Sequence, residues 1–318
     1  MKANALYYRM LKYQPGNLEL LHRLFEVTTV DDPRADTDAL LREAEVVFAP
    51  LGFLVDKAKL DRCPRLRAVV SNTTSIPHID TAEAERRGIH VCALHNEQEF
   101  LATITPTAEH TIGLMMAVWR HVPAAHAAAC RGEWDRRPWG APRMLSRMRL
   151  GIMGYGRLGR RTALIAEAIG MKVRFYDPDN LGTVPTLREL AAESDVLSLH
   201  APGRPDTRGL VSREVLQALP RGAIVINTAR GELLDTEALL DLLESGHLAG
   251  AALDTIDGEY DPGFPEVFAR SRLLAYARTH DDLILTPHIG GSTVDAWGET
   301  ERRVLLKAAC ALGLPVDA

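Results

Sequence analysis

The stretch RLGIMGYGRLGRRTALIAEAIG, residues 149–170, joins an apolar run to an amphipathic one through a turn rich in glycine. Its opening residues RLGIMGY predict a buried strand. The residues after them predict a helix with Leu158, Ile165 and Ile169 near one face, capped at its C-terminal end by Gly170. A strand that leads directly into a helix is the start of a βαβ unit, so this stretch indicates a parallel sheet covered by helices.

The turn within this stretch reads GYGRLG, which matches the pattern G-x-G-x-x-G. Gly154 permits a tight turn, Gly156 lets the backbone approach a pyrophosphate, and Gly159 lets the helix pack closely on the strand. The N-terminus of the helix adds free N–H groups and the positive end of its dipole. A glycine-rich turn without a ligand is the alternative, but the position between a strand and a helix favours a dinucleotide site.

A carboxylate follows at the distance that a dinucleotide site requires. Asp177 ends the next predicted strand, KVRFYD, 18 residues after Gly159. At that place a carboxylate bonds the ribose hydroxyls of NAD and repels the 2′-phosphate of NADP. The continuation DPDN contains no lysine or arginine that would accept such a phosphate. The sequence therefore predicts NAD as the cofactor.

Length and composition describe an ordinary globular protein of about two domains. The 318 residues are 46% hydrophobic and 25% charged, and the net charge of −5 gives no sign of a nucleic-acid partner. No apolar run has the length of a membrane helix, and the N-terminus lacks the apolar core of a signal peptide. The four cysteines are scattered, without the spacing of metal ligands. We expect a cytoplasmic protein with reduced thiols, no metal and no membrane partner.

Strands and helices alternate along nearly the whole chain, which predicts an α/β protein of two Rossmann-like, doubly wound parallel-sheet domains with the active-site cleft between them. A long helix is expected to begin after Thr105, with Pro106 in its first turn and a kink or an end near Pro123. The final helix is expected to return to the first domain. We predict a discontinuous substrate domain, 1–102 plus 293–318, and an NAD-binding domain, 103–292. The predicted strands are 45–50, 66–71 and 89–94 in the first, and 149–155, 172–177, 196–200, 223–229, 250–255 and 283–288 in the second.

Three polar residues follow successive strands of the second predicted sheet. Arg230, Glu259 and His288 are separated by 29 and 29 residues, and each interval includes one return to the sheet. Because the carboxyl ends of parallel strands share one edge, the three side chains are expected to gather there. An arginine fork can hold a carboxylate and polarise the neighbouring carbonyl, while a histidine donates the proton as hydride arrives. A glutamate beside that histidine favours the charged imidazole and orients the ring.

The sequence resembles the D-isomer-specific 2-hydroxyacid dehydrogenase family over nearly its whole length. The resemblance is carried by TAEHT, LGIMGYGRLGRRTA, YDP, LHAP with DTRGLV, the long block from Gly222 to Asp254, and TPHIGGST. It implies that Arg230 binds the substrate, that Glu259 supports the histidine, and that His288 is the acid/base. Besides the three glycines of the turn, it implies cofactor contacts from Thr107, Arg157, Leu158, Asp177, Pro202, Thr207, Thr228, Ala229, Asp254 and Gly290.

The resemblance also implies an activity and an assembly. It implies an NAD-dependent oxidoreductase that interconverts a small 2-oxoacid and a D-2-hydroxyacid by hydride transfer. Members usually form homodimers through the nucleotide-binding domain, with the long helix after Thr105 taking part. Two other interpretations stay open: an NAD(H)-sensing, corepressor-like binding protein of the same fold, and a dehydrogenase acting on a phosphonate or phosphorus oxyacid.

Two segments depart from the commonest pattern of the family. The substrate-domain loop reads SNTTSIPHID, so Thr73 and Ser75 replace the usual glycines, with Thr74 between them. These three residues are the predicted substrate-binding loop, together with Arg230. Their hydroxyls either bind a second polar group, such as a phosphate, or satisfy a turn locally. The segment between Glu259 and His288 is longer than in many members and carries aromatic residues able to close over the substrate.

Overall fold

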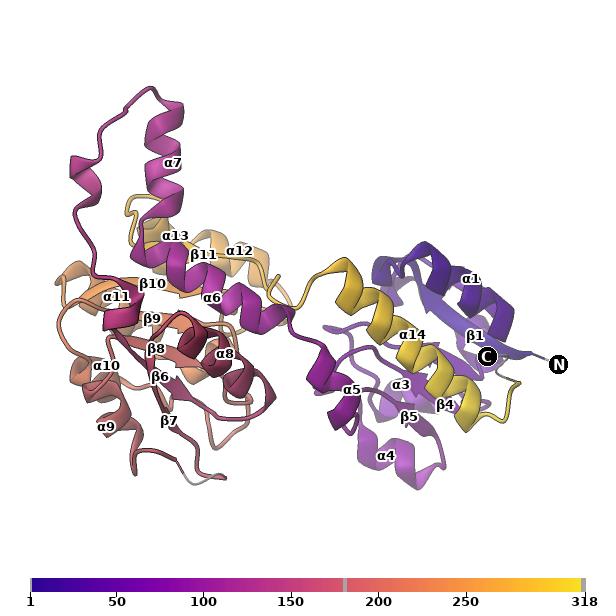
Figure 1. Cartoon of the computed structure of the whole chain (residues 1–318). Coiled ribbons are helices and arrows are strands. Elements are labelled where there is room, and N and C mark those ends of the chain that lie inside the picture. Colours follow the sequence, from indigo (N-terminus) through magenta and orange to yellow (C-terminus); the bar gives the residue numbers. More distant parts are fainter. Residues whose placement is uncertain (1, 180–181, 316–318) are drawn as a thin grey trace. The chain divides into compact units, whose positions relative to one another are not determined.

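The computed structural model describes residues 2–179 and 182–315. The chain divides into two compact units, each of which is described by itself: unit 1 comprises 1–104 and 292–318, and unit 2 comprises 105–291 (Figure 1). The outermost residues of the predicted substrate domain, 1 and 316–318, lie outside the described residues.

The described part of unit 1 contains a five-stranded parallel sheet in the order β2-β1-β3-β4-β5. The three predicted strands of this unit are present, and two further strands precede them. Its strands are β1 (Ala3–Tyr8), β2 (Phe25–Val30), β3 (Val46–Phe48), β4 (Ala68–Val70) and β5 (His90–Cys92). Its helices are α1 (Pro15–Leu24), α2 (Asp38–Glu43), α3 (Lys57–Asp61), α4 (Thr81–Arg86), α5 (Gln98–Thr103) and α14 (Val294–Ala311).

Alternating side chains of β1 give unit 1 a core on each face of its sheet. Ala5 and Tyr7 join the core beneath α1, α5 and α14, whereas Leu6 and Tyr8 join the core beneath α2, α3 and α4. Figure 1 shows α14 lying across β4 and β5, and its residue Val304 is fully buried there. The last helix of the chain is therefore part of the core of unit 1.

The described part of unit 2 contains a six-stranded parallel sheet in the order β11-β10-β9-β8-β6-β7. All six predicted strands are present, and the prediction of two Rossmann-like domains is confirmed. The strands are β6 (Arg149–Met153), β7 (Lys172–Tyr176), β8 (Val196–Leu199), β9 (Ala223–Asn227), β10 (Leu248–Leu253) and β11 (Leu283–Leu285). The helices are α6 (Pro106–Trp119), α7 (Val122–Cys130), α8 (Arg157–Ala168), α9 (Leu187–Ala192), α10 (Arg213–Ala218), α11 (Thr236–Glu244), α12 (Phe264–Ala269) and α13 (Arg272–Ala277).

Both faces of this sheet are covered. Helices α6 and α8 share a core with one face, and α9, α10, α11 and α13 share a core with the other. The chain reverses its direction of winding after β7, because β6 pairs with β7 on one side and with β8 on the other. Ligands of doubly wound sheets bind at the carboxyl ends of the strands near this reversal.

The long predicted helix is divided in two. Helix α6 ends at Trp119, and α7 begins at Val122 after His121 adopts the left-handed conformation with φ 52°. Pro123 thus lies in the first turn of a new helix, where its missing N–H leaves no helical bond unmade. Thr105 takes the N-cap position, but its hydroxyl donates to the Glu109 carboxylate at 2.5 Å and caps no backbone N–H.

Within residues 2–179 and 182–315, no helix is both long and apolar enough to cross a membrane.

Candidate active site

The predicted site residues of unit 2 follow the carboxyl ends of its strands. The glycine turn follows β6, Asp177 follows β7, and Pro202 follows β8. Arg230, Asp254 and His288 follow β9, β10 and β11, which are neighbours in the sheet. Because all six strands are parallel, one edge of the sheet carries all of these residues.

The glycine turn has the geometry that a bound pyrophosphate requires. Gly154 adopts φ +91°, and a Cβ there would lie 2.6 Å from the backbone nitrogen of Ala201. A Cβ on Gly159 would lie 2.1 Å from the Gly154 carbonyl oxygen, so only glycine lets α8 pack this closely. Gly156, the N-cap of α8, faces open space, because a Cβ there would meet no atom within 4 Å. The turn therefore leaves room for phosphates at the N-terminus of a twelve-residue helix.

Asp177 is held beside the glycine turn by two backbone groups. Its Oδ2 accepts from the Tyr155 N–H at 2.6 Å, and its Oδ1 accepts from the Asp179 N–H at 2.9 Å. The Tyr155 ring stacks on Phe175 with 3.6 Å between centroids, which fixes the same turn to β7. The residues present thus fit the adenosine half of NAD, with the carboxylate oriented at the end of β7.

The other predicted cofactor residues form supporting networks along the same edge. The Thr228 hydroxyl bonds that of Thr111 on α6 at 2.7 Å, and the Ala229 N–H donates to the Asn227 side chain at 3.0 Å. Thr207 closes its own turn, accepting from the Arg204 N–H and donating to the Pro202 carbonyl. Thr107 lies beside Gly290, and Arg157 and Leu158 form the first turn of α8.

Asp254 fixes the loop that carries His288. The Asp254 side chain is 1% exposed and accepts from the Thr286 hydroxyl at 2.6 Å and from two N–H groups, those of Ile289 at 2.9 Å and Gly290 at 2.8 Å. The His288 N–H donates to the Asp254 carbonyl at 2.8 Å. These bonds hold His288 at φ +52°, a left-handed conformation that costs a non-glycine residue about 1 to 3 kcal/mol.

His288 and Glu259 form a direct pair. The distance between His288 Nδ1 and Glu259 Oε1 is 2.8 Å, and the side chains are 31% and 14% exposed. A carboxylate accepts from Nδ1–H and thereby fixes the tautomer of the imidazole. In the described residues no group bonds Nε2 of His288, which leaves that nitrogen to meet a substrate.

The loop that carries Arg230 packs at a glycine against the loop that leads to Glu259. A Cβ on Gly231 would lie 2.0 Å from the Asp257 nitrogen, so the loops after β9 and β10 approach as closely as backbones can. The Asn227 amide donates to the Arg230 carbonyl at 2.9 Å, and Arg230 Nη1 donates to the Ala229 carbonyl at 2.6 Å. Arg230 is thus placed at the same edge as the pair but bonds its own loop.

The predicted substrate loop of unit 1 uses one of its hydroxyls internally. Thr73 Oγ1 donates to the Ser75 carbonyl at 2.8 Å and lies 3.0 Å from the Ser71 hydroxyl. Two alternatives were open for the hydroxyls of this loop. For Thr73 the second applies, because its hydroxyl bonds within the turn. Thr74 and Ser75 are exposed after β4.

Other polar groups offer less chemistry. Loss of solvent around the His200 ring lowers its pKa to about 4, so it stays neutral near pH 7.

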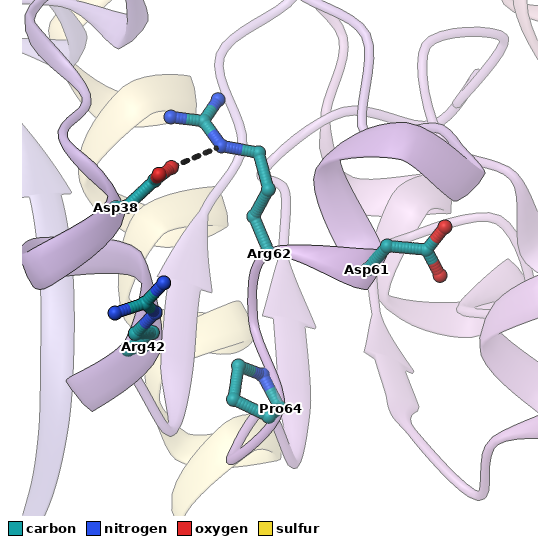
Figure 2. A pocket seen from close by; sticks show the side chains of 5 residues that line it. All are labelled: Asp38, Arg42, Asp61, Arg62 and Pro64. Carbon is teal, nitrogen blue, oxygen red and sulfur yellow. Dashed lines mark hydrogen bonds and ion pairs between the residues drawn. The ribbon is translucent and has the colours of Figure 1, made fainter.

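A pocket on unit 1 is lined by two carboxylates and two guanidinium groups, with Asp38 paired to Arg62 at 2.9 Å (Figure 2). Asp61 is paired to Arg87, so the charges there are largely compensated. Over the described ranges, no three His, Cys, Asp or Glu side chains are grouped as metal ligands.

Comparison with known proteins matches residues 112–290 to the model of the D-isomer-specific 2-hydroxyacid dehydrogenase, NAD-binding domain. The chain belongs to this family. Unit 2 contains the NAD-binding domain of this dehydrogenase family, as the glycine turn and Asp177 indicate.

The matches include dehydrogenases of several named specificities. The chain is 37% identical over 246 residues to D-3-phosphoglycerate dehydrogenase of Haemophilus influenzae, covering 74% of this chain and 56% of that protein. It is 32% identical to glyoxylate reductase of Thermofilum pendens, covering 80% and 75% of the two chains. The structure of Aquifex aeolicus D-lactate dehydrogenase with NAD and lactic acid covers 98% of this chain and 94% of its own, with 25% identity and a TM-score of 0.78. The chain spans about half the length of the D-3-phosphoglycerate dehydrogenases it matches.

Sequence reasoning missed some residues of this candidate site. Tyr260 Oη lies 2.9 Å from His288 Nδ1, yet the sequence singled out only the aromatic residues of its segment as a group. Its position directly after Glu259 was the available signal. His110 on α6 lies 3.2 Å from the Thr286 hydroxyl and 3.4 Å from Asp254 Oδ1. The contacts of Tyr260 and His110 depend on how separate segments pack together, which a sequence pattern does not predict.

Proposed function

We propose that the protein is an NAD-dependent oxidoreductase that interconverts a small 2-oxoacid and a D-2-hydroxyacid. The observation that carries this proposal is the His288–Glu259 pair, at 2.8 Å, on the edge of the sheet that also carries the glycine turn. Membership of a dehydrogenase family supports it. Named relatives that act on 3-phosphoglycerate and glyoxylate support a substrate with a carboxylate beside the reacting carbon.

The proposed mechanism assigns one task to each residue of the trio. Arg230 binds the substrate carboxylate and polarises the adjacent carbonyl. Bound NADH supplies the hydride. Nε2 of His288 gives its proton to the carbonyl oxygen during reduction and takes it back during oxidation. Glu259, bonded to Nδ1, stabilises the imidazolium and keeps Nε2 directed away from the protein.

We assign the substrate-binding role to unit 1, and within it to the loop of Thr73, Thr74 and Ser75, in which Thr73 shapes the turn. Because the Thr73 hydroxyl is used within the turn, the exposed Thr74 and Ser75 are the residues available to a second polar group of the substrate. This assignment favours a small, unphosphorylated oxoacid over a phosphonate, since few groups of this loop remain to bind a phosphorus oxyacid.

The experiment that tests the function is NADH oxidation by the purified protein with a panel of 2-oxoacids. The panel runs from glyoxylate and pyruvate to branched, phosphorylated and phosphonate compounds. Turnover of at least one unphosphorylated 2-oxoacid is the expected result. Turnover confined to phosphonates would support the alternative substrate class. Tight NADH binding with no turnover of any compound would contradict the proposal and favour a dinucleotide-sensing binding protein.

Replacing Asp177 with asparagine is expected to reduce the preference for NADH over NADPH by about tenfold or more. The amide keeps an oxygen that can accept from the Tyr155 N–H, but the negative charge that repels a 2′-phosphate is lost. Dissociation constants for both dinucleotides, measured by fluorescence titration, check this prediction. An unchanged ratio would remove Asp177 from the ribose site.

We further propose that the protein is a homodimer assembled through α6 and α7. Figure 1 shows α7 extending beyond the sheet of unit 2, and the helix buries only Ala128 of its described residues. Val122 is 53% exposed and Trp134, just beyond the helix, is 92% exposed. Exposed apolar side chains of this size favour burial in an interface. Light scattering is expected to give twice the 35.0 kDa of one chain, and Trp134→Glu is expected to shift the mass toward one chain.

A further inference from the structure

Tyr260 lies next to the proposed acid/base pair because of a tight turn. The Asp261 N–H donates to the Gly258 carbonyl at 2.8 Å, so Glu259 and Tyr260 are the two central residues of a β-turn. Gly258 adopts φ +75°, a conformation that favours glycine. The start of this loop is held by Arg208, which pairs with Asp257 at 2.8 Å. The turn thus carries two consecutive side chains to one place.

Both side chains contact the same nitrogen of His288. Glu259 Oε1 lies 2.8 Å from Nδ1, and Tyr260 Oη lies 2.9 Å from it. An ionised carboxylate only accepts hydrogen bonds, so Nδ1 carries the hydrogen in this arrangement. This N–H already donates to Glu259, so the phenol oxygen of Tyr260 is its second acceptor. The two rings are 5.9 Å apart between centroids and inclined at 50°.

We propose that Tyr260 is a positioning residue of the acid/base pair: its hydroxyl shares the Nδ1 hydrogen of His288 with Glu259, holds the imidazole in place and favours its charged form. The catalytic part of this proposal rests on the proposed function, whereas the contact between Tyr260 and His288 is independent of it. Tyr260 is 44% exposed, so its side chain does not form part of the folding core. A structural requirement for this hydroxyl is therefore not expected.

Partial burial of the Tyr260 side chain, together with the neighbouring charges, keeps the phenol neutral in the pH range where an imidazole titrates. Burial, followed by the negative charge of Glu259, raises the pKa of Tyr260 to about 12. The positive charge of Arg230 acts in the opposite direction, and those of Asp254 and Glu232 act with Glu259. Any change of protonation between pH 5 and 9 at this pair therefore belongs to groups other than the phenol. Glu259 and Tyr260, on the turn after β10, are the titratable groups that contact His288 directly. The other charged groups that act on Tyr260 are Arg230 and Glu232 after β9 and Asp254 after β10, and His110 on α6 lies 3.4 Å from Asp254 Oδ1.

The first test is Tyr260→Phe, observed by NMR of the histidine rings in the whole protein. The His288 signals are assigned by their absence from the spectrum of His288→Asn. The hydrogen bond from Nδ1–H to the phenol oxygen stabilises the imidazolium more than the neutral ring. Its loss is therefore expected to lower the titration midpoint of His288 by about 0.3 to 1 unit. Tyr276→Phe is the matched control, since it removes a phenol that donates to Asp282 elsewhere in unit 2. It is expected to leave the midpoint unchanged.

The second test is the pH profile of NADH-dependent reduction. Because reduction requires the imidazolium, the alkaline limb of kcat/KM is expected to move to lower pH by the same amount in Tyr260→Phe. The value at the optimum is expected to fall about 3- to 10-fold, with NADH affinity unchanged.

Each result separates the two proposals. A lowered midpoint without any turnover by the unaltered protein supports the positioning role and contradicts the proposed function. An unchanged or raised midpoint overturns the role of Tyr260. So does a loss of rate that is equal at every pH, because a merely structural defect produces that pattern.

Discussion

The variant His288→Asn is expected to bind NADH normally and to reduce the 2-oxoacid about 10²- to 10⁴-fold more slowly. The side chain of asparagine cannot transfer a proton at neutral pH, but the residue tolerates the left-handed conformation that His288 adopts at φ +52°. The backbone bond from residue 288 to the Asp254 carbonyl is retained. The loop is therefore expected to keep its shape while the chemistry is lost.

Steady-state rates and NADH fluorescence titration check this result together. His280→Asn is the matched control, because His280 bonds the Tyr276 carbonyl in the same unit, away from the proposed site. It is expected to leave both quantities unchanged. A loss of turnover below tenfold in His288→Asn would exclude His288 as the proton donor. A parallel loss of NADH binding would assign the residue a structural role.

Replacing Arg230 with lysine is expected to lower kcat/KM for the 2-oxoacid about 10- to 100-fold. Arginine offers a planar fork that bonds both oxygens of a carboxylate, whereas lysine offers a single point charge. The loss of one charge-assisted bond, about 1.5 to 3 kcal/mol, corresponds to this range. Lysine retains the aliphatic part of the side chain. In Arg230 this part lies close to Gly203, where an added Cβ would come within 2.9 Å of Arg230 Cγ.

The affinity for NADH distinguishes substrate binding from a structural defect. It is expected to change less than twofold in Arg230→Lys. Arg213→Lys is the control, since Arg213 forms an exposed ion pair with Asp241 and such pairs contribute about 1 kcal/mol at most. Equal losses of substrate turnover and NADH affinity would show that Arg230 supports the loop after β9 and does not bind the substrate.

The strands of unit 2 were predictable because most are apolar runs ended by a polar or glycine-rich turn, and β7, KVRFY, alternates charged and apolar residues before Asp177. The first two strands of unit 1 were not. Helix α1 passes directly into β2 at Leu24 and Phe25, with no proline or glycine between them. Strand β1, ANALYY, buries side chains on both of its faces, so it shows no alternation of polar and apolar residues. Pro123 predicted the break between α6 and α7, but the left-handed residue His121 at that break could not be predicted from the sequence.

The site was predictable as far as strand order determines it. Parallel strands bring Arg230, Glu259 and His288 to one edge whatever the loops do. The contacts around them depend on loop geometry: Gly231 lies against Asp257, and Tyr260 reaches His288 only because of the turn at Gly258. The engagement of the Thr73 hydroxyl within its own loop was one of two open alternatives for the same reason.

Unit 1 is encoded by two separate segments, and this order has a consequence for synthesis on the ribosome. Residues 105–291 emerge as one continuous stretch and can complete their own sheet before α14 is synthesised. Unit 1 cannot, because Val304, Leu305 and Ala308 of its core belong to α14, which follows unit 2 in the sequence. The face of β4 and β5 that α14 covers therefore stays open to solvent on the growing polypeptide until α14 has been synthesised.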